Sequence, residues 1–375
     1  MQSTKHNNFF LIVLLILIIM VGAWRPPFPQ SRELITALFR VGAIISLVFV
    51  VWESNKWIAI FLLAAILPQF YLAKPLEILQ IKSSLFFPDI DTVITSINVI
   101  MGVVWYHVII SKVKNTREND ELIMSIMCVS AVAFTVLLIS QCLTKKPILG
   151  TLTNPNESSA FLALSLVCFF RKRWVFFIPF ILVGLVLCRS CTGILGAIVG
   201  IAVYVFFAWN ILSFIVCIIT VIAAGISFVF YVDTPTIFQR VRVWKELIIV
   251  YKDSWLFGFE FGRLKWVTLQ NKIFRYIDSG TGNLWWYTAN NEFIHTLCEK
   301  GILFVVAISG YIINIIKRIQ RVRPAIPLAG LATILTTSCS TYVFHNGLTA
   351  LTSIILLALV ERQLRRGEDY EKILV

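Results

Sequence analysis

The first candidate for chemistry in this sequence is Arg189, which directly follows the apolar stretch 174–188. A guanidinium beside so long an apolar run is costly unless it pairs or reaches water, so such a residue commonly has a function. Ser190 and Thr192 could add hydroxyl donors to an anion that Arg189 holds. Alternatively, Arg189 only anchors the end of the apolar stretch at a layer of lipid headgroups.

Two further arginines, Arg240 and Arg242, lie just before Trp244 in a stretch whose pattern predicts an amphipathic helix from Phe238 to Tyr251. Arg240 and Trp244 are four residues apart and therefore share one face of that helix. Because the planar fork of a guanidinium grips phosphate, two arginines near a membrane surface suit a diphosphate. The alternative is an interfacial helix that lies on anionic headgroups.

Ionisable residues gather where a long polar stretch becomes a new apolar run. Asn290 and Asn291 stand there as suitable N-cap residues, and Glu292, His295 and Glu299 follow at i, i+3 and i+7 on one helical stripe. Ionisable groups that enter an apolar helix usually face an internal cavity. Glu292 could therefore act as a general base toward a hydroxyl, or orient that hydroxyl. Alternatively, the stripe only satisfies its own hydrogen bonds.

His345 stands between two apolar runs, where an imidazole could accept a proton near neutral pH. A lone histidine in a loop is, however, more often simply solvated. No cluster of His, Cys and Asp has metal-ligand spacing, and no glycine-rich phosphate loop or G-x-S-x-G motif is present in the sequence. We therefore expect no metal site and no cofactor.

The composition of the chain indicates a polytopic membrane protein. Of its 375 residues, 58% are hydrophobic and 14% are charged, against roughly 25% charged residues in soluble domains. A net charge of +13 would suggest nucleic acid in a soluble protein; in a membrane protein it bears on topology, and we expect no nucleic-acid partner. Most of the eight cysteines lie in apolar runs, where they pack as small hydrophobic residues.

The apolar segments predict an all-α membrane protein with about 12 transmembrane helices, because a span needs about 20 apolar residues. The shortest segments, such as 158–170, must borrow flanking residues or be shielded by their neighbours. The complete set is 9–23, 34–52, 57–72, 92–110, 122–143, 158–170, 174–188, 193–208, 211–231, 291–316, 325–343 and 347–361.

Lysine and arginine in the short loops predict the orientation of these spans. They are more numerous on the side that holds both termini, which is therefore the cytoplasmic side. The chain then divides into residues 1–231 with helices 1–9, an extracytoplasmic loop at 232–290, and residues 291–375 with helices 10–12 and a cytoplasmic tail. The polar breaks at 144–157, 189–193 and 342–347 fall on the outer side with this loop.

Three short segments within this layout resemble the O-antigen ligase and O-antigen polymerase family of bacterial envelope polysaccharide enzymes. Gly150–Glu157 is similar to the family's Gly…Asn-Pro-Asn segment, and Arg240–Gly262 is similar to its Arg…Trp stretch with following glycines. Asn290–Phe293 together with Glu299–Ile302 is similar to the family's helix entry. The chain departs from the family at Trp255, where the family has proline, and at Asn290, where it has histidine. Ligases depend on that histidine more than polymerases do, so the resemblance favours a polymerase.

The resemblance implies metal-independent glycosyl transfer at the outer face of the bacterial inner (cytoplasmic) membrane. The donor would be an undecaprenyl-diphosphate-linked glycan, and the acceptor another lipid-linked repeat unit in a polymerase or lipid A core in a ligase. A flippase for the same lipid-linked sugar is a further alternative, although the sequence lacks the internal repeat that many transporters have. Besides membrane lipids, a chain-length regulator would be a candidate partner.

The resemblance also implies roles for individual residues. Arg189 and Arg240, supported by Arg242, would hold the diphosphate and stabilise the charge that develops on it. Glu292 or His345 would take the proton of the acceptor hydroxyl. The remaining candidates would bind substrate: Asn154, Asn156, Asn290, Asn291 and His295.

Overall fold

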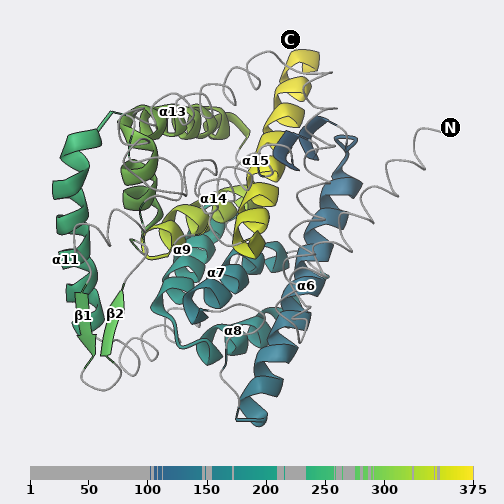
Figure 1. Ribbon diagram of the computed structural model, residues 1–375. Coiled ribbons are helices and arrows are strands. Elements are labelled where there is room, and N and C mark those ends of the chain that lie inside the picture. Colours follow the sequence, from purple (N-terminus) through teal and green to yellow (C-terminus); the bar gives the residue numbers. More distant parts are fainter. Residues whose placement is uncertain are drawn as a thin grey trace, which may run out of the picture. The chain divides into compact units, whose positions relative to one another are not determined.

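The computed structural model (Figure 1) describes residues 102, 105–107, 109–111, 113–145, 148, 154–170, 173–208, 215, 234–256, 258, 264, 275–278, 282–285, 289, 291–322, 325–341, 343 and 347–374. The predicted spans 9–23, 34–52 and 57–72, most of 92–110 and nearly all of 211–231 lie outside these residues, as do Asn290 and His345. The chain forms two compact units. One holds the described residues 105–215 and 313–374, and the other holds residue 102 and those from 234 to 312.

The first unit consists of helices at the predicted apolar segments. They are α6 (Arg117–Leu143), α7 (Pro155–Leu166) with the 3-10 turn η1 (Val167–Phe170), the 3-10 turn η2 (Val175–Phe177), α8 (Ile178–Leu187), α9 (Cys191–Ala208), α14 (Ala325–Ser338) and α15 (Gly347–Leu374). The prediction of helices in these segments is confirmed, although α14 ends before 343. Among the described helices, α6 alone is long and apolar enough to cross a membrane as one continuous element, which is compatible with membrane insertion.

Side-chain caps define where α6 and α7 begin. The Thr116 hydroxyl accepts a hydrogen bond from the backbone N–H of Asn119 at 3.3 Å, and Glu118 and Asp120 place negative charge in the first turn of α6. Both features stabilise a helix N-terminus. In α7 the cap is Asn154, followed by a proline at the first helical turn, where its missing N–H costs nothing.

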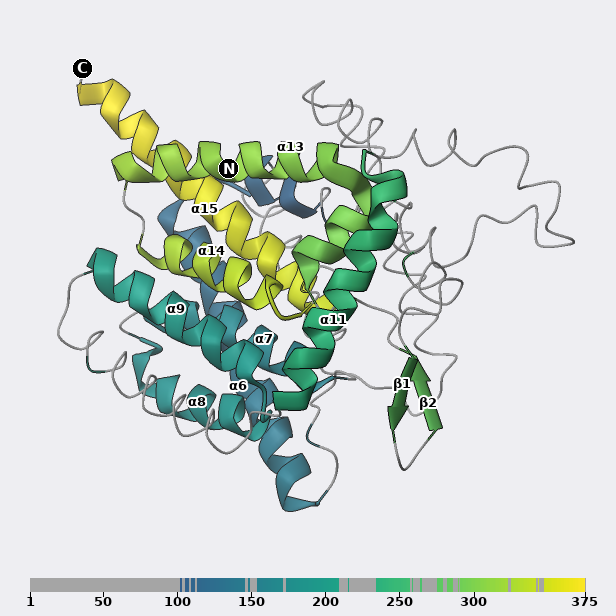
Figure 2. The ribbon, with the colours of Figure 1, turned by 90° about the vertical axis from the view of Figure 1, so that its left-hand side faces the viewer.

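Helix α7 is enclosed by its neighbours, since every residue from Glu157 to Phe170 is buried. Helix α9 packs on α7 and α14 (Figure 2), and three of its glycines, Gly193, Gly196 and Gly200, lie at these contacts. A Cβ at Gly193 would lie 2.4 Å from Cβ of Ser159, and one at Gly200 would lie 2.1 Å from Oγ1 of Thr333. Small residues allow such close approach between helices. The prediction that the short segment 158–170 must be shielded is therefore confirmed.

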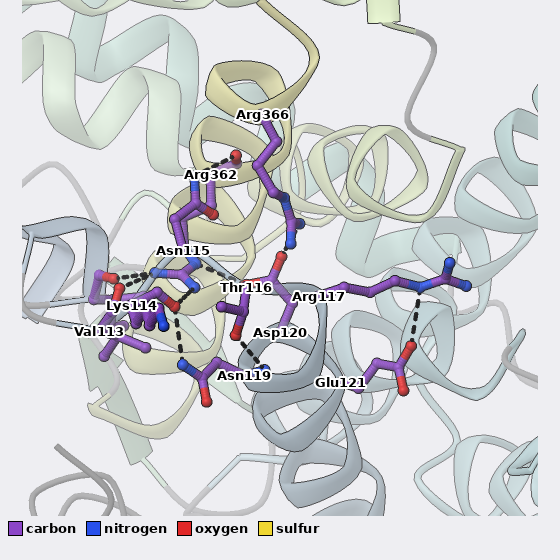
Figure 3. A network of polar contacts seen from close by, with 11 residues as sticks. Val113, Lys114, Asn115, Thr116, Arg117, Asn119, Asp120, Glu121, Arg362 and Arg366 are labelled. Atoms are coloured by element: carbon purple, nitrogen blue, oxygen red, sulfur yellow. Dashed lines mark hydrogen bonds and ion pairs between the residues drawn. The ribbon is translucent and has the colours of Figure 1, made fainter. Parts of the chain in front are cut away.

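Arg362 of α15 is fully buried beside the start of α6 (Figure 3). Its Nε donates to Oδ1 of Asp120 at 2.7 Å. Asp120 is also buried and accepts a second hydrogen bond from Arg366. The Nη atoms of Arg362 donate at 2.8, 2.6 and 2.8 Å to three carbonyl oxygens just before α6, those of Ile109, Val113 and Lys114. A buried guanidinium is tolerable here because a carboxylate and these carbonyls satisfy its donors.

The second unit contains α11 (Thr234–Tyr251), the 3-10 turn η3 (Lys252–Ser254), and an antiparallel hairpin of β1 (Arg275–Asp278) and β2 (Gly282–Trp285). Helix α11 confirms the predicted amphipathic helix. The all-α prediction is confirmed for the architecture of the described residues, and the hairpin adds two short strands within the predicted loop. Outside this hairpin, the regular elements that the structure describes are all helical.

Helix α13 (Glu292–Val322) begins in the second unit and bends sharply. Its parts Glu292–Ile302 and Phe304–Arg318 meet at an angle of 119°. The bend occurs at Gly301, whose φ of 74° is readily adopted only by glycine. The predicted span 291–316 is therefore a bent pair of helices rather than one continuous rod.

Candidate functional site

The N-termini of α7 and α9 meet in the first unit. Asn154 caps α7 by accepting a hydrogen bond from the backbone N–H of Asn156 at 2.9 Å. Ser190, the residue before α9, donates its hydroxyl to Oδ1 of Asn156 at 2.6 Å. The structure thus brings together two segments that the sequence predicts on the outer side.

Arg189 forms the turn between α8 and α9 in a left-handed backbone conformation, with a φ of 52°. Its backbone N–H donates to the carbonyl oxygen of Val186 at 3.0 Å, and its side chain is exposed. Such a conformation costs a non-glycine residue about 1 kcal/mol or more, so the backbone alone would favour glycine. The guanidinium and the positive ends of two helix dipoles together favour an anion at this junction.

In the second unit, α11 carries Arg240 and Trp244 four residues apart on one face. The indole Nε1 of Trp244 donates to the carbonyl oxygen of Ala289 at 2.7 Å. This bond ties the helix that carries Arg240 to the chain just before α13. Arg242 is 83% exposed and pairs with Glu246 at 3.1 Å across one helical turn.

The first turn of α13 holds a buried carboxylate. Asn291 is the N-cap, because its Oδ1 accepts a hydrogen bond from the backbone N–H of Ile294 at 3.1 Å. Glu292 follows with a buried side chain, and its Oε1 accepts a hydrogen bond from the Thr296 hydroxyl at 3.3 Å. The helix dipole stabilises a negative charge at this position.

His295 and Glu299 form a second pair, one turn further into α13. Nε2 of His295 lies 3.1 Å from Oε1 of Glu299, and the two side chains are 5% and 1% exposed. The next residue, Lys300, interacts electrostatically with the carboxylates of Glu292 and Glu299, and its Nζ lies 5.0 Å from the centre of the Phe304 ring. The stripe predicted from the sequence is therefore helical and buried, and an imidazole and a carboxylate lie in contact within it.

The turn that follows α11 packs on the same part of α13. Burial raises the pKa of the Tyr251 phenol, which stays protonated and donates to the carbonyl oxygen of Trp255. That oxygen also accepts a hydrogen bond from the backbone N–H of Ile302 at 3.0 Å. Gly258, with a φ of 74°, lies so close to Glu299 that a Cβ would come within 2.4 Å of its carbonyl carbon. These contacts fix the backbone that carries the His295–Glu299 pair.

The predicted site residues are divided between the two units. Asn154, Asn156 and Arg189 lie in the first, while Arg240, Arg242, Asn291, Glu292 and His295 lie in the second. The sequence reasoning missed the contact of Gly258 with Glu299, because a loop glycine gives no sign of what it touches. The proximity of His295 and Glu299 agrees with their predicted place on one stripe.

Comparison of the chain with known protein families, with curated proteins and with solved structures finds no match. Functional inference therefore depends on the chemistry of the described residues. Each unit carries an arginine suited to phosphate, and the second unit adds a buried group of carboxylates and an imidazole that can exchange protons.

Proposed function

We propose that this protein polymerises undecaprenyl-diphosphate-linked oligosaccharide repeat units at the outer face of the bacterial inner membrane. It would be a multi-pass protein of about 12 spans with both termini in the cytoplasm. The contacts within the first unit support this orientation. Asn156 bonds to Ser190, both predicted outside, whereas Arg362 bonds to the backbone of Lys114, both predicted inside.

The observation that carries the proposal is the Trp244–Ala289 hydrogen bond in the second unit. It joins the helix that bears Arg240 to the chain that leads into Glu292, so that one compact unit holds a phosphate-binding cation and a buried proton acceptor. A glycosyl transfer with a diphosphate leaving group needs both functions. The cation stabilises the negative charge that develops on the departing diphosphate, and the acceptor takes the proton of the attacking hydroxyl.

In this reaction the hydroxyl oxygen of one repeat unit attacks the anomeric carbon of another. The new glycosidic C–O bond forms while the C–O bond to the diphosphate breaks, and the lipid diphosphate leaves. Arg240 binds the diphosphate oxygens, and exposed Arg242 adds positive charge nearby. Arg189, in the first unit, is a second anion-binding candidate, a role that the resemblance implies. The proton passes to an ionisable group at the start of α13, for which Glu292 is the candidate from sequence.

The proposal is tested by the glycan that a deletion strain makes. Loss of the polymerase should leave single repeat units in place of the ladder of chain lengths, and an unchanged ladder would refute the proposal. A ligase predicts instead that full-length polymer accumulates on the lipid carrier while lipid A core stays bare. A flippase predicts that purified protein forms no glycosidic bond from purified lipid-linked donor.

Variants of the arginines test the mechanism in the purified protein. Arg240→Lys and Arg189→Lys should each lose most of the transfer activity, because a point charge replaces a bidentate fork. Arg117→Lys is the matched control, since Arg117 is 86% exposed and pairs across one helical turn with Glu121. Near-normal activity of both Arg240→Lys and Arg189→Lys would remove these residues from the site.

A further inference from the structure

One side of α8 is exposed and apolar along its whole length, and an exposed arginine stands at each end. Together with η2, the helix runs from Val175 to Leu187, and its buried side includes Ile181 and Leu185. On the other side exposed residues recur every three or four positions, as on one face of a helix. They are Arg173, Phe176, Pro179, Val183, Val186 and Arg189. This stripe is therefore an apolar surface with a cation at each end.

The stripe is too short to match an ordinary bilayer. At a rise of 1.5 Å per residue, Val175–Leu187 covers roughly 20 Å, whereas the hydrocarbon core of a bilayer is about 30 Å thick. The neighbouring helix α6 has exposed apolar residues from Leu122 to Leu143, which cover roughly 32 Å at the same rise. Two helices of the first unit that pack on each other thus differ by about one third in the length of their exposed apolar surface.

Contacts between α8 and α6 place the stripe within the length of α6. Near the start of the stripe, Nε1 of Trp174 donates to Oγ of Ser125 at 3.2 Å. Further along, a Cβ at Gly184 would lie 2.8 Å from Oγ1 of Thr135. The two contacts join residues with the same separation in sequence, so α8 runs parallel to α6 in constant register. Arg189 therefore comes level with the last turn of α6, before the exposed apolar residues of that helix end.

The backbone at the two ends of α8 is irregular. Arg189 forms a turn in the left-handed conformation, and its side chain is exposed. Arg173 and Trp174 form another turn just before η2. Irregular backbone that faces lipid does not occur within the hydrocarbon core, because its N–H and C=O groups need partners there. Outward reach of the arginine side chains would not supply those partners, so water or headgroups must come to the depth of both turns.

We propose that α8 binds a locally thinned bilayer. Phospholipid acyl chains cover the apolar stripe, and headgroup phosphates of the two leaflets lie at Arg173 and Arg189, where guanidinium groups complement their charge. The deformation brings the phosphates of the outer leaflet to the depth of Arg189. The inference rests on the membrane placement in the proposed function and does not depend on the chemistry of glycosyl transfer.

The test lengthens the apolar stripe and varies the thickness of the bilayer. Full-length protein is placed in vesicles of phosphatidylcholines whose acyl chains range from about 14 to about 22 carbons, and Tm is followed by tryptophan fluorescence. Arg173→Leu/Arg189→Leu removes the two cations that require thinning. Its Tm relative to that of the wild type should rise with chain length, by about 5 °C or more across the series, because only the wild type must deform the thicker bilayers.

Arg117→Leu is the matched control, since it removes an exposed arginine from the start of α6, whose exposed apolar surface already matches a full bilayer. Its Tm difference from the wild type should stay constant with chain length. Should the double variant fail to fold, Arg173→Leu alone should show a smaller rise of the same sign. A constant or falling difference in the α8 variants, or an equal rise in Arg117→Leu, would refute the thinning alone. Wild-type protein that does not insert into the vesicles would instead refute the proposed function, and this inference with it.

Discussion

Arg362→Ala should strongly destabilise the first unit. The substitution takes one of two guanidinium partners from buried Asp120 and leaves three carbonyl oxygens, among them that of Val113 at 2.6 Å, without their donor. Removal of one partner from a buried ion pair costs about 3–5 kcal/mol. Since each kcal/mol lowers Tm by about 2–4 °C in a domain of 150–250 residues, Tm should fall by about 6–20 °C.

The matched control is Arg365→Ala, which removes the same residue type three positions further along α15. Arg365 is 52% exposed and pairs with Glu361 at 2.8 Å within one turn, an arrangement worth about 0–1 kcal/mol. The assay is thermal unfolding in detergent, followed as the loss of the monodisperse peak in size-exclusion chromatography. Equal losses in the two variants, or a fall of less than about 2 °C for Arg362→Ala, would show that the buried contact does not hold α15 to the start of α6.

Two glycine-related substitutions give further predictions. Gly258→Ala should lower Tm and transfer activity, because a left-handed backbone costs alanine about 1–2 kcal/mol and the new Cβ would lie 2.4 Å from the carbonyl carbon of Glu299. Gly310→Ala is the control. Its Cβ would meet nothing within 4 Å, so this substitution should lower neither Tm nor activity. Arg189→Gly should leave Tm unchanged or raise it, since glycine relieves the φ of 52°, yet it should abolish transfer. A glycine variant that transferred normally would make Arg189 an anchor only.

The helices of the first unit could be predicted because each apolar run is bounded by polar residues and by local caps. Asn154 and Pro155 mark the start of α7 in the sequence as clearly as in the structure. Even the enclosure of α7 follows from its length, because so short a segment cannot meet lipid alone. These features depend only on neighbours along the chain.

Contacts between residues far apart in the sequence could not be predicted. Asp120 and Arg362 are separated by most of the described chain, and nothing in their local patterns pairs them. The bend at Gly301 could not be predicted, because a single glycine inside a helical pattern does not by itself end a helix. Strands as short as β1 and β2 carry too few residues for an alternating pattern to show.

The enclosure of α7 also determines when the chain can fold during its synthesis. Its partners α14 and α15 leave the ribosome roughly 10–30 s after α7, at roughly 5–20 residues per second. Until then the small-residue face of α9 has no partner from α14, and α7 has no stable surroundings on that side. A nascent or truncated chain that stops before Ala325 therefore presents an unfinished helix bundle to the cell's proteases. Such a chain should therefore be degraded faster than the full-length chain.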